Sequence, residues 1–246
     1  MLYITIFTLG LLIGSFLNAV IYRLHSGEGL IKTRSHCPKC GHILAWYELV
    51  PVLSFVIQRG RCRQCRARIS LQYPLVEIAT ASLFILVLYY NLPLIYTTTA
   101  VSLLIVIFVY DLKHYIIPDK VIYPAILLAG IGLWQQATYA IQYTTYAAFL
   151  AAAFFASVFF VSKGKWLGFG DVKLAFFMGL FLGWPNILVA LFMAFILGGI
   201  IGIALILFNK KTMKSQVPFG PFLVGGTIMS MFWGAEIINW YKGFLL

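Results

Sequence analysis

Long apolar stretches separated by short polar segments run along almost the whole chain. Stretches that could cross a hydrocarbon layer of about 30 Å lie at residues 3–22, 74–90, 94–110, 121–136, 145–162, 174–184, 186–208 and 219–240. The sixth is short, and Trp184-Pro185-Asn186 predicts a tight turn between it and the seventh. The pattern predicts eight transmembrane helices, or seven if residues 174–208 re-enter the membrane instead of spanning it.

One polar segment interrupts this pattern. Residues 23–73 are rich in Cys, Arg and Pro and have no long helical period. We therefore predict three parts: a first transmembrane helix (1–22), a cytoplasmic four-cysteine loop domain (23–73) and a transmembrane domain (74–246). Composition agrees, because 62% of the residues are hydrophobic and 10% charged, whereas soluble domains are about half apolar and a quarter charged. The predicted fold class is an all-α polytopic membrane protein.

The net charge of +11 first suggests a nucleic-acid binder or a polybasic surface. The distribution of the basic residues gives a different explanation. If residues 23–73 are cytoplasmic, 17 of the 18 Lys and Arg residues fall on the same side, including Lys210, Lys211 and Lys214. This is the bias of the positive-inside rule. It predicts a cytoplasmic face for residues 23–73, with both termini outside, the lipid bilayer as a partner and no nucleic acid.

All four cysteines lie in the polar loop, as Cys37-Pro-Lys-Cys40 and Cys62-Arg-Gln-Cys65. Two C-x2-C pairs separated by 21 residues are typical of a structural zinc site with four thiolate ligands. The alternatives are disulfides, which a reducing cytoplasm disfavours, and a redox pair. The basic run at 59–68 either offsets the charge of the metal site or binds anionic lipid heads. We interpret the nearby histidines as solvated loop residues: His25, His36 and His42.

Two of the seven acidic residues, Asp111 and Asp171, stand at ends of apolar stretches. The topology places both at the cytoplasmic boundary, where an ionisable group on a membrane helix is a functional-site hypothesis. Paired carboxylates that share a proton can activate water against a peptide carbonyl. A plain turn with Asp171 as a helix cap is the alternative.

Other residues near these acids have expected roles of their own. Gly168 and Gly170 permit positive φ or close backbone approach, so an extended substrate strand could place its scissile carbonyl over Asp171. Asp119 follows Pro118 and is interpreted as a helix cap. Glu77 is expected either to receive a basic group of the substrate or to pair with an arginine of the loop.

Several motifs occur in the order seen in one family. They are Gly14-Ser-Phe-Leu-Asn-Ala-Val-Ile-Tyr-Arg23, the two C-x2-C pairs, Tyr73-Pro-Leu-Val-Glu77, Asp111 with Ile117-Pro-Asp119, and Gly168-Phe-Gly-Asp-Val-Lys173. Together they resemble bacterial type IV prepilin peptidases, which are aspartyl proteases of the Gly-x-Gly-Asp type.

The resemblance implies a specific activity. It implies cleavage of the short basic leader of membrane-embedded prepilins and pseudopilins, with Asp111 and Asp171 as the catalytic residues. It also implies N-methylation of the new terminal residue with S-adenosylmethionine, an activity associated with the cysteine-bearing loop. The family tolerates Asn at the position of Asp119, which agrees with a cap.

Two other function classes compete with this hypothesis. A proton- or cation-coupled transporter would use Asp111 and Asp171 as an ion path, but that class places its acids near the bilayer midplane on broken helices. A membrane methyltransferase or scaffold without protease activity would use the cysteine loop and leave both aspartates structural.

Overall fold

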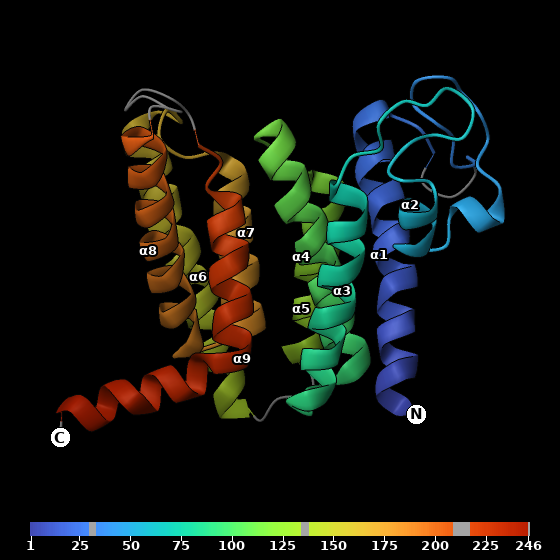
Figure 1. Cartoon of the computed structure of the whole chain (residues 1–246). Helices are drawn as coiled ribbons and strands as arrows, with labels where there is room; N and C mark the ends of the chain where they lie inside the picture. The colour runs from blue at the N-terminus through green and yellow to red at the C-terminus, as the bar shows by residue number, and fades with distance from the viewer. Residues whose placement is uncertain (30–32, 134–137, 209–216, 246) are drawn as a thin grey trace. The chain divides into compact units, whose positions relative to one another are not determined.

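The computed structural model describes residues 1–29, 33–133, 138–208 and 217–245 (Figure 1). Lys210, Lys211 and Lys214 of the predicted charge bias lie outside these residues. Within them, strand pairing is limited to two isolated antiparallel bridges, His36 with Ile43 and Arg61 with Arg68. The helices are α1 (Leu2–Ser26), the short 3-10 helix η1 (Trp46–Glu48), α2 (Leu53–Ile57), α3 (Gln72–Tyr89), α4 (Leu94–His114), α5 (Asp119–Leu133), α6 (Thr138–Ser162), α7 (Phe169–Leu182), α8 (Asn186–Leu207) and α9 (Gly220–Leu245).

Eight long helices, α1 and α3 to α9, coincide with the eight predicted apolar stretches, and the predicted fold class is confirmed. Among the described residues, six segments are long and apolar enough to cross a membrane: Leu2–Ser26, Gln72–Tyr89, Leu94–His114, Ile141–Ser162, Asn186–Leu207 and Gly220–Gly243. Helices α5 and α7 have 15 and 14 residues, which is about 21–22 Å of length. Full spanning by these two helices stays a prediction.

The chain folds into two compact units, residues 1–106 and 107–246. In the first unit α1 packs along α3 (Figure 1). A Cβ atom on Gly10 would lie 2.5 Å from Ala81 Cα, and one on Gly14 would lie 2.7 Å from Glu77 Cα. Small residues at this spacing let two membrane helices approach closely, so the two glycines set the separation of α1 and α3.

In the second unit α7 packs against α5, α6, α8 and α9. Its side chains are apolar on nearly every side, and Leu174, Phe177 and Met178 are fully buried. A helix that is apolar all round belongs in the interior of a bundle. Gly179 lies directly against the backbone of Ala148 on α6. These contacts hold α7 among its neighbours and thereby fix the position of its first turn, which contains Asp171.

Candidate active site and cysteine cluster

Asp111 lies in the last turn of α4, and its exposed fraction is 4%. The chain reverses directly after it. Tyr115 has φ of 58°, and its N–H donates to the Asp111 carbonyl at 2.9 Å. Pro118 then precedes the start of α5. This tight connection keeps Asp111 beside residues 115–119, which are therefore part of the same local structure.

Asp171 is the third residue of α7 and is 7% exposed. Gly168 precedes the helix with extended backbone angles, φ −79° and ψ 150°. Its N–H donates to Asp171 Oδ2 at 3.1 Å, and the N–H of Asp171 donates to the Gly168 carbonyl at 3.1 Å. The N-cap residue is therefore Gly168 and not Asp171, which stands at the third helical position and accepts the N–H of the cap residue. This hydrogen bond occupies one carboxylate oxygen and holds the side chain in place.

The end of α4 and the starts of α5, α7 and α9 meet around these acids. A Cβ atom on Gly170 would lie 2.9 Å from Ile117 Cβ, which precedes α5. A Cβ atom on Gly220, the first residue of α9, would lie 2.5 Å from Asp111 Oδ2 and 3.4 Å from Ile117 Cδ1. The Gly220 N–H also hydrogen-bonds the Asp111 carboxylate. Ile117 thus touches both glycines, and the glycines allow the close approach.

Asp111 and Asp171 both belong to the second unit, and both side chains are buried. Asp111 contacts Gly220, Asp171 follows Gly170, and both glycines lie against Ile117. Two carboxylates that share a buried site do not both ionise readily, because like charges repel and burial disfavours charge. A carboxylate pair that shares one proton has the arrangement that acid–base activation of a water molecule needs.

The sequence did not indicate two contacts beside the pair. Lys173 Nζ lies 2.6 Å from Asp119 Oδ1 and also lies over the rings of Tyr123, at 4.9 Å, and Phe169, at 5.4 Å. Asp119 does begin α5, but its side chain joins α5 to α7. Gly220 was missed as well. Its only sequence signal is its position between two proline-containing steps, in Pro218-Phe-Gly-Pro221.

Glu77 belongs to the first unit and is 6% exposed. Its Oε2 accepts a hydrogen bond from the Val52 N–H at 2.7 Å, and the Ser15 side chain also hydrogen-bonds it. Val52 has φ of 58°, a rare conformation for a β-branched residue. Glu77 therefore fixes the loop before α2 onto α1 and α3. The expected role toward a basic substrate group stays a prediction.

The four cysteines form a cluster whose Sγ atoms all lie within 4.8 Å of one another. The two C-x2-C turns have the same construction. The N–H of Cys37 donates to the His42 carbonyl and the N–H of Cys62 to the Ala67 carbonyl, both at 2.9 Å. Each turn is closed by one of the two isolated bridges. The two halves therefore present their sulfur atoms to a common centre.

The donor set fits a metal ion. Sulfur ligands about 2.3 Å from a zinc ion are about 3.8 Å apart in a tetrahedron, and the Sγ atoms of Cys37 and Cys65 are 3.9 Å apart. Backbone N–H groups of Cys65 and Gln64 lower the pKa of the Cys62 thiol to about 6. At Cys40 the backbone N–H of His42 lowers the thiol pKa, but burial and the neighbouring thiols outweigh it and raise the pKa to about 11. A cation at the centre would remove this conflict by stabilising all four thiolates.

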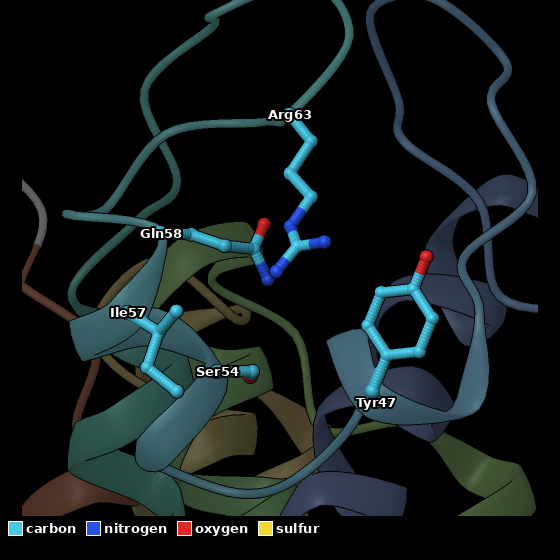
Figure 2. A pocket seen from close by; sticks show the side chains of 5 residues that line it. All are labelled: Tyr47, Ser54, Ile57, Gln58 and Arg63. Carbon is cyan, nitrogen blue, oxygen red and sulfur yellow. The ribbon is translucent and has the colours of Figure 1, made fainter.

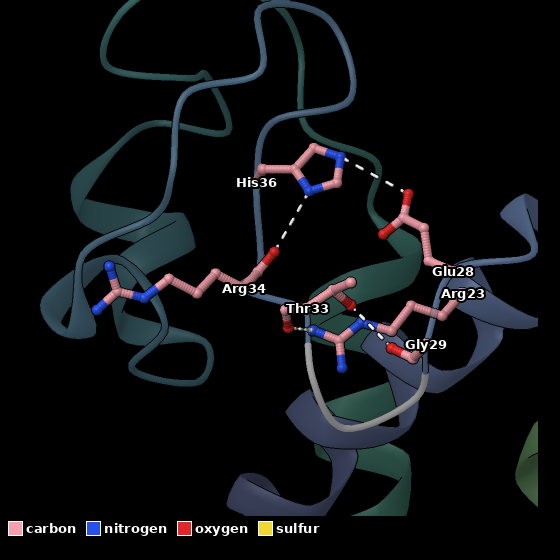
Figure 3. A network of polar contacts seen from close by, with 6 residues as sticks. All are labelled: Arg23, Glu28, Gly29, Thr33, Arg34 and His36. Carbon is pink, nitrogen blue, oxygen red and sulfur yellow. Dashed lines mark hydrogen bonds and ion pairs between the residues drawn. The ribbon is translucent and has the colours of Figure 1, made fainter.

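A polar network supports the first C-x2-C turn (Figure 3). Arg23, near the end of α1, donates to the Thr33 carbonyl at 2.6 Å. His36 donates to the Arg34 carbonyl at 3.3 Å and lies 3.9 Å from a carboxylate oxygen of Glu28. His42 lies 3.3 Å from the buried carboxylate of Glu48. These two histidines therefore contact acids of the loop and stand outside the sulfur cluster.

These features define a class: a helical, multi-pass membrane protein with two buried aspartates at helix ends and a four-cysteine site suited to a metal ion. Comparison with known proteins gives the family. The bacterial peptidase A24 N-terminal domain matches residues 8–91, and the type IV leader peptidase family matches residues 98–203.

Curated relatives agree over nearly the full length. The prepilin leader peptidase/N-methyltransferase of Legionella pneumophila is 30% identical, over 99% of this chain and 95% of the relative. The proteins of the same name from Bacillus subtilis and Pseudomonas putida are 31% and 33% identical, over 96% of this chain and 96% and 92% of the relatives. No solved structure matches the chain. The chain belongs to the type IV leader peptidase family, which confirms both the resemblance and the prediction of an enzyme.

Proposed function

We propose that this enzyme cleaves the basic leader of type IV prepilins and pseudopilins with the Asp111–Asp171 pair, and then N-methylates the new terminal residue. The observation that carries the peptidase proposal is that two buried carboxylates stand at helix ends that close on Ile117 and Asp111 through Gly170 and Gly220. The names of the relatives support both activities. The peptidase part is the transmembrane domain at 74–246, and the methyltransferase part is the loop domain at 23–73.

The proposed cleavage is general acid–base catalysis on water. The ionised carboxylate of the pair removes a proton from water as the water oxygen attacks the scissile carbonyl carbon. The protonated carboxyl donates a hydrogen bond to the carbonyl oxygen, where negative charge develops. The proton taken from water then passes to the leaving amide nitrogen as the C–N bond breaks. The pair ends with the proton count with which it began.

The extended backbone at Gly168 supports a substrate strand that lies beside Asp171. Neither Gly168 nor Gly170 has positive φ. At Gly170 the reason for glycine is the close approach of Ile117, whereas a Cβ atom on Gly168 would meet only ordinary contacts. We further propose that Glu77 seats a basic residue of the leader, in addition to its bond with Val52.

The charge distribution supports a cytoplasmic site in the bacterial inner membrane, with both termini outside. A basic leader and a basic cytoplasmic face repel at long range. The apolar helix of the prepilin shares the bilayer with the enzyme, so recruitment through that helix is the route we propose.

For the loop domain we propose a structural zinc ion held by Cys37, Cys40, Cys62 and Cys65. S-adenosylmethionine, when bound, supplies the methyl group for the free amine of the cleaved product. The contribution of the loop itself is to hold its cysteine turns and the residues between them in fixed positions. Zinc content of the purified protein, measured by elemental analysis before and after Cys→Ser changes, tests the metal.

Replacement of each aspartate tests the peptidase proposal. Asp111→Asn and Asp171→Asn should each lower leader cleavage by about 10³-fold or more, since neither carboxamide can share the proton. Methylation of a pre-cleaved pilin should continue in both variants. Glu236→Gln is the matched control, because it neutralises an exposed acid of the same unit. Normal cleavage by either Asn variant would instead support a scaffold with structural aspartates.

A further inference from the structure

The loop between α1 and α3 contains an apolar segment that forms η1 and α2. Residues 43–58 include one charged side chain, Glu48, and that side chain is buried. The large apolar side chains are exposed instead, and those of Leu53, Val56 and Ile57 are each more than half exposed. An uncharged surface of exposed apolar side chains marks a contact with a membrane or with another protein.

The segment is held well below the ends of the two helices that it joins. The Val52 N–H, directly before α2, donates to the Glu77 carboxylate at 2.7 Å, and Ser15 hydrogen-bonds the same carboxylate. Glu77 lies five residues after the start of α3 at Gln72, and Ser15 lies 11 residues before the end of α1 at Ser26. At 1.5 Å per residue, these separations are about 8 Å and about 16 Å. Figure 1 shows α2 beside the body of α1 and not beyond its end.

This level lies within the apolar part of both helices. The apolar stretch of α1 continues to Tyr22, seven residues or about 10 Å beyond Ser15. Near the same level, α1 and α3 expose apolar side chains: Leu12, Phe16, Leu75 and Ile78. A helix that spans a membrane turns such side chains to the hydrocarbon. The start of α2 therefore lies at a depth where the protein is surrounded by lipid.

The turn before α2 is suited to this depth. Non-helical backbone is tolerated in the membrane only where the protein itself satisfies the polar groups. Glu77 accepts the Val52 N–H, and the Ser54 N–H donates to the Val50 carbonyl at 3.0 Å. Pro51 has no N–H to satisfy. The buried carboxylate of Glu77 thus supplies the acceptor that a turn at this level needs.

Exposed arginines follow the apolar segment directly: Arg59, Arg61, Arg63, Arg66 and Arg68. Figure 2 shows Arg63 reaching back to the space between Gln58 and Tyr47, and its guanidinium carbon lies 5.0 Å from the centre of the Tyr47 ring. Arginine and tyrosine are typical of the headgroup level, where their polar tips meet water and phosphate while their apolar parts lie deeper. The positive charge is complementary to anionic lipid heads.

We propose that residues 46–57 enter the bilayer as a re-entrant segment, with the exposed side chains of η1 and α2 among the acyl chains and the arginines of 59–68 at the lipid heads. The loop domain is then partly embedded in the membrane instead of wholly cytoplasmic. The two C-x2-C turns flank the segment in the sequence, so the cysteine cluster is held at the membrane surface. The proposal depends on neither the peptidase nor the methyltransferase assignment.

The test is photo-crosslinking from the full-length protein in lipid nanodiscs. p-Benzoylphenylalanine replaces Val56 or Ile57, and lipid adducts are measured by mass spectrometry. Leu75 is the matched position on a membrane helix, and Arg34 is an exposed, charged position of the loop outside the segment. Adduct yields at the two segment positions should equal the yield at Leu75 within about twofold and exceed that at Arg34 by about tenfold or more, because acyl chains are confined to the hydrocarbon layer.

Thermal unfolding in detergent identifies the variants that fold, and Leu53 offers a third position in the segment. Yields in folded variants that are no higher than the yield at Arg34 would place the segment in water and overturn the proposal. Adducts with a prepilin in the same nanodiscs, or with a second copy of the chain, in place of lipid would make this face a protein docking surface and would also overturn it.

Discussion

Gly220 is the most sensitive test of the proposed active site, because a single added methyl group would reach an oxygen of the proposed catalytic residue Asp111. The Cβ atom of Gly220→Ala would lie 2.5 Å from Asp111 Oδ2, whereas carbon and oxygen normally approach to about 3.3 Å. The carboxylate must therefore move by about 0.8 Å. A displacement near 1 Å at a reacting group can cost about 10²-fold in rate, so we expect kcat for leader cleavage to fall by about 10- to 100-fold.

The same substitution should leave the fold intact. The atom that must move is the end of a side chain, and alanine is favoured over glycine in a helix by up to about 1 kcal/mol. Gly225→Ala is the control on the same helix, since its Cβ would meet only Leu197 Cδ1 at 3.6 Å, an ordinary contact. Cleavage of a purified prepilin is followed by gel mobility, and folding by thermal unfolding in detergent. Wild-type kcat for a folded Gly220→Ala protein would refute the placement of Asp111 in the catalytic pair.

Three further predictions concern other contacts. Lys173→Ala should lower the free energy of unfolding by only about 0.2–1 kcal/mol, because its partner Asp119 is largely exposed. Exchange of the two residues, Lys173→Asp with Asp119→Lys, should recover part of the lost stability in thermal unfolding. No recovery would mean that the pairing contributes nothing. Cys62→Ser should abolish bound metal in elemental analysis, and full metal retention would contradict a four-sulfur site. Glu77→Ala should destabilise the protein by about 1–3 kcal/mol, because it removes the carboxylate that accepts the Val52 N–H. Glu77→Gln keeps an acceptor oxygen and serves as the test of a substrate role. Slower cleavage of a basic leader than of a neutralised one by Glu77→Gln would reveal that role, and equal slowing would argue against it.

The helices were predictable because hydrocarbon imposes one dominant requirement, an apolar stretch of sufficient length. The predicted bounds are wrong at the two helix ends that contain Asp111 and Asp171. The fourth helix continues through Asp111 to His114, beyond the predicted end at 110, and α7 begins at Phe169 rather than 174. In both cases a charged residue ended the apolar stretch but not the hydrogen-bonded helix. Hydropathy therefore placed both aspartates beside helices, while the structure places them inside helical turns.

The partners of the acids could not be derived from the pattern. Helices in a membrane are apolar all round, so the 3.6-residue period that reveals the buried face of a soluble helix carries little information here. The contact of Gly220 with Asp111 joins residues 109 positions apart in the sequence, and the Lys173–Asp119 pair spans 54. The spacing of the cysteines, by contrast, did predict a cluster that can bind metal, because two short turns that supply two ligands each are a local and repeated arrangement.

Both units hold polar groups at fixed positions, and they do so by different means. The loop does so with four sulfur atoms that converge on one point, which makes its geometry dependent on an ion. The helical unit does so with glycines, since Gly170 and Gly220 let two helix ends close on Ile117 and Asp111. Loss of metal should therefore disturb the loop, while an added methyl group at a helix end should disturb cleavage, and each defect should appear without the other.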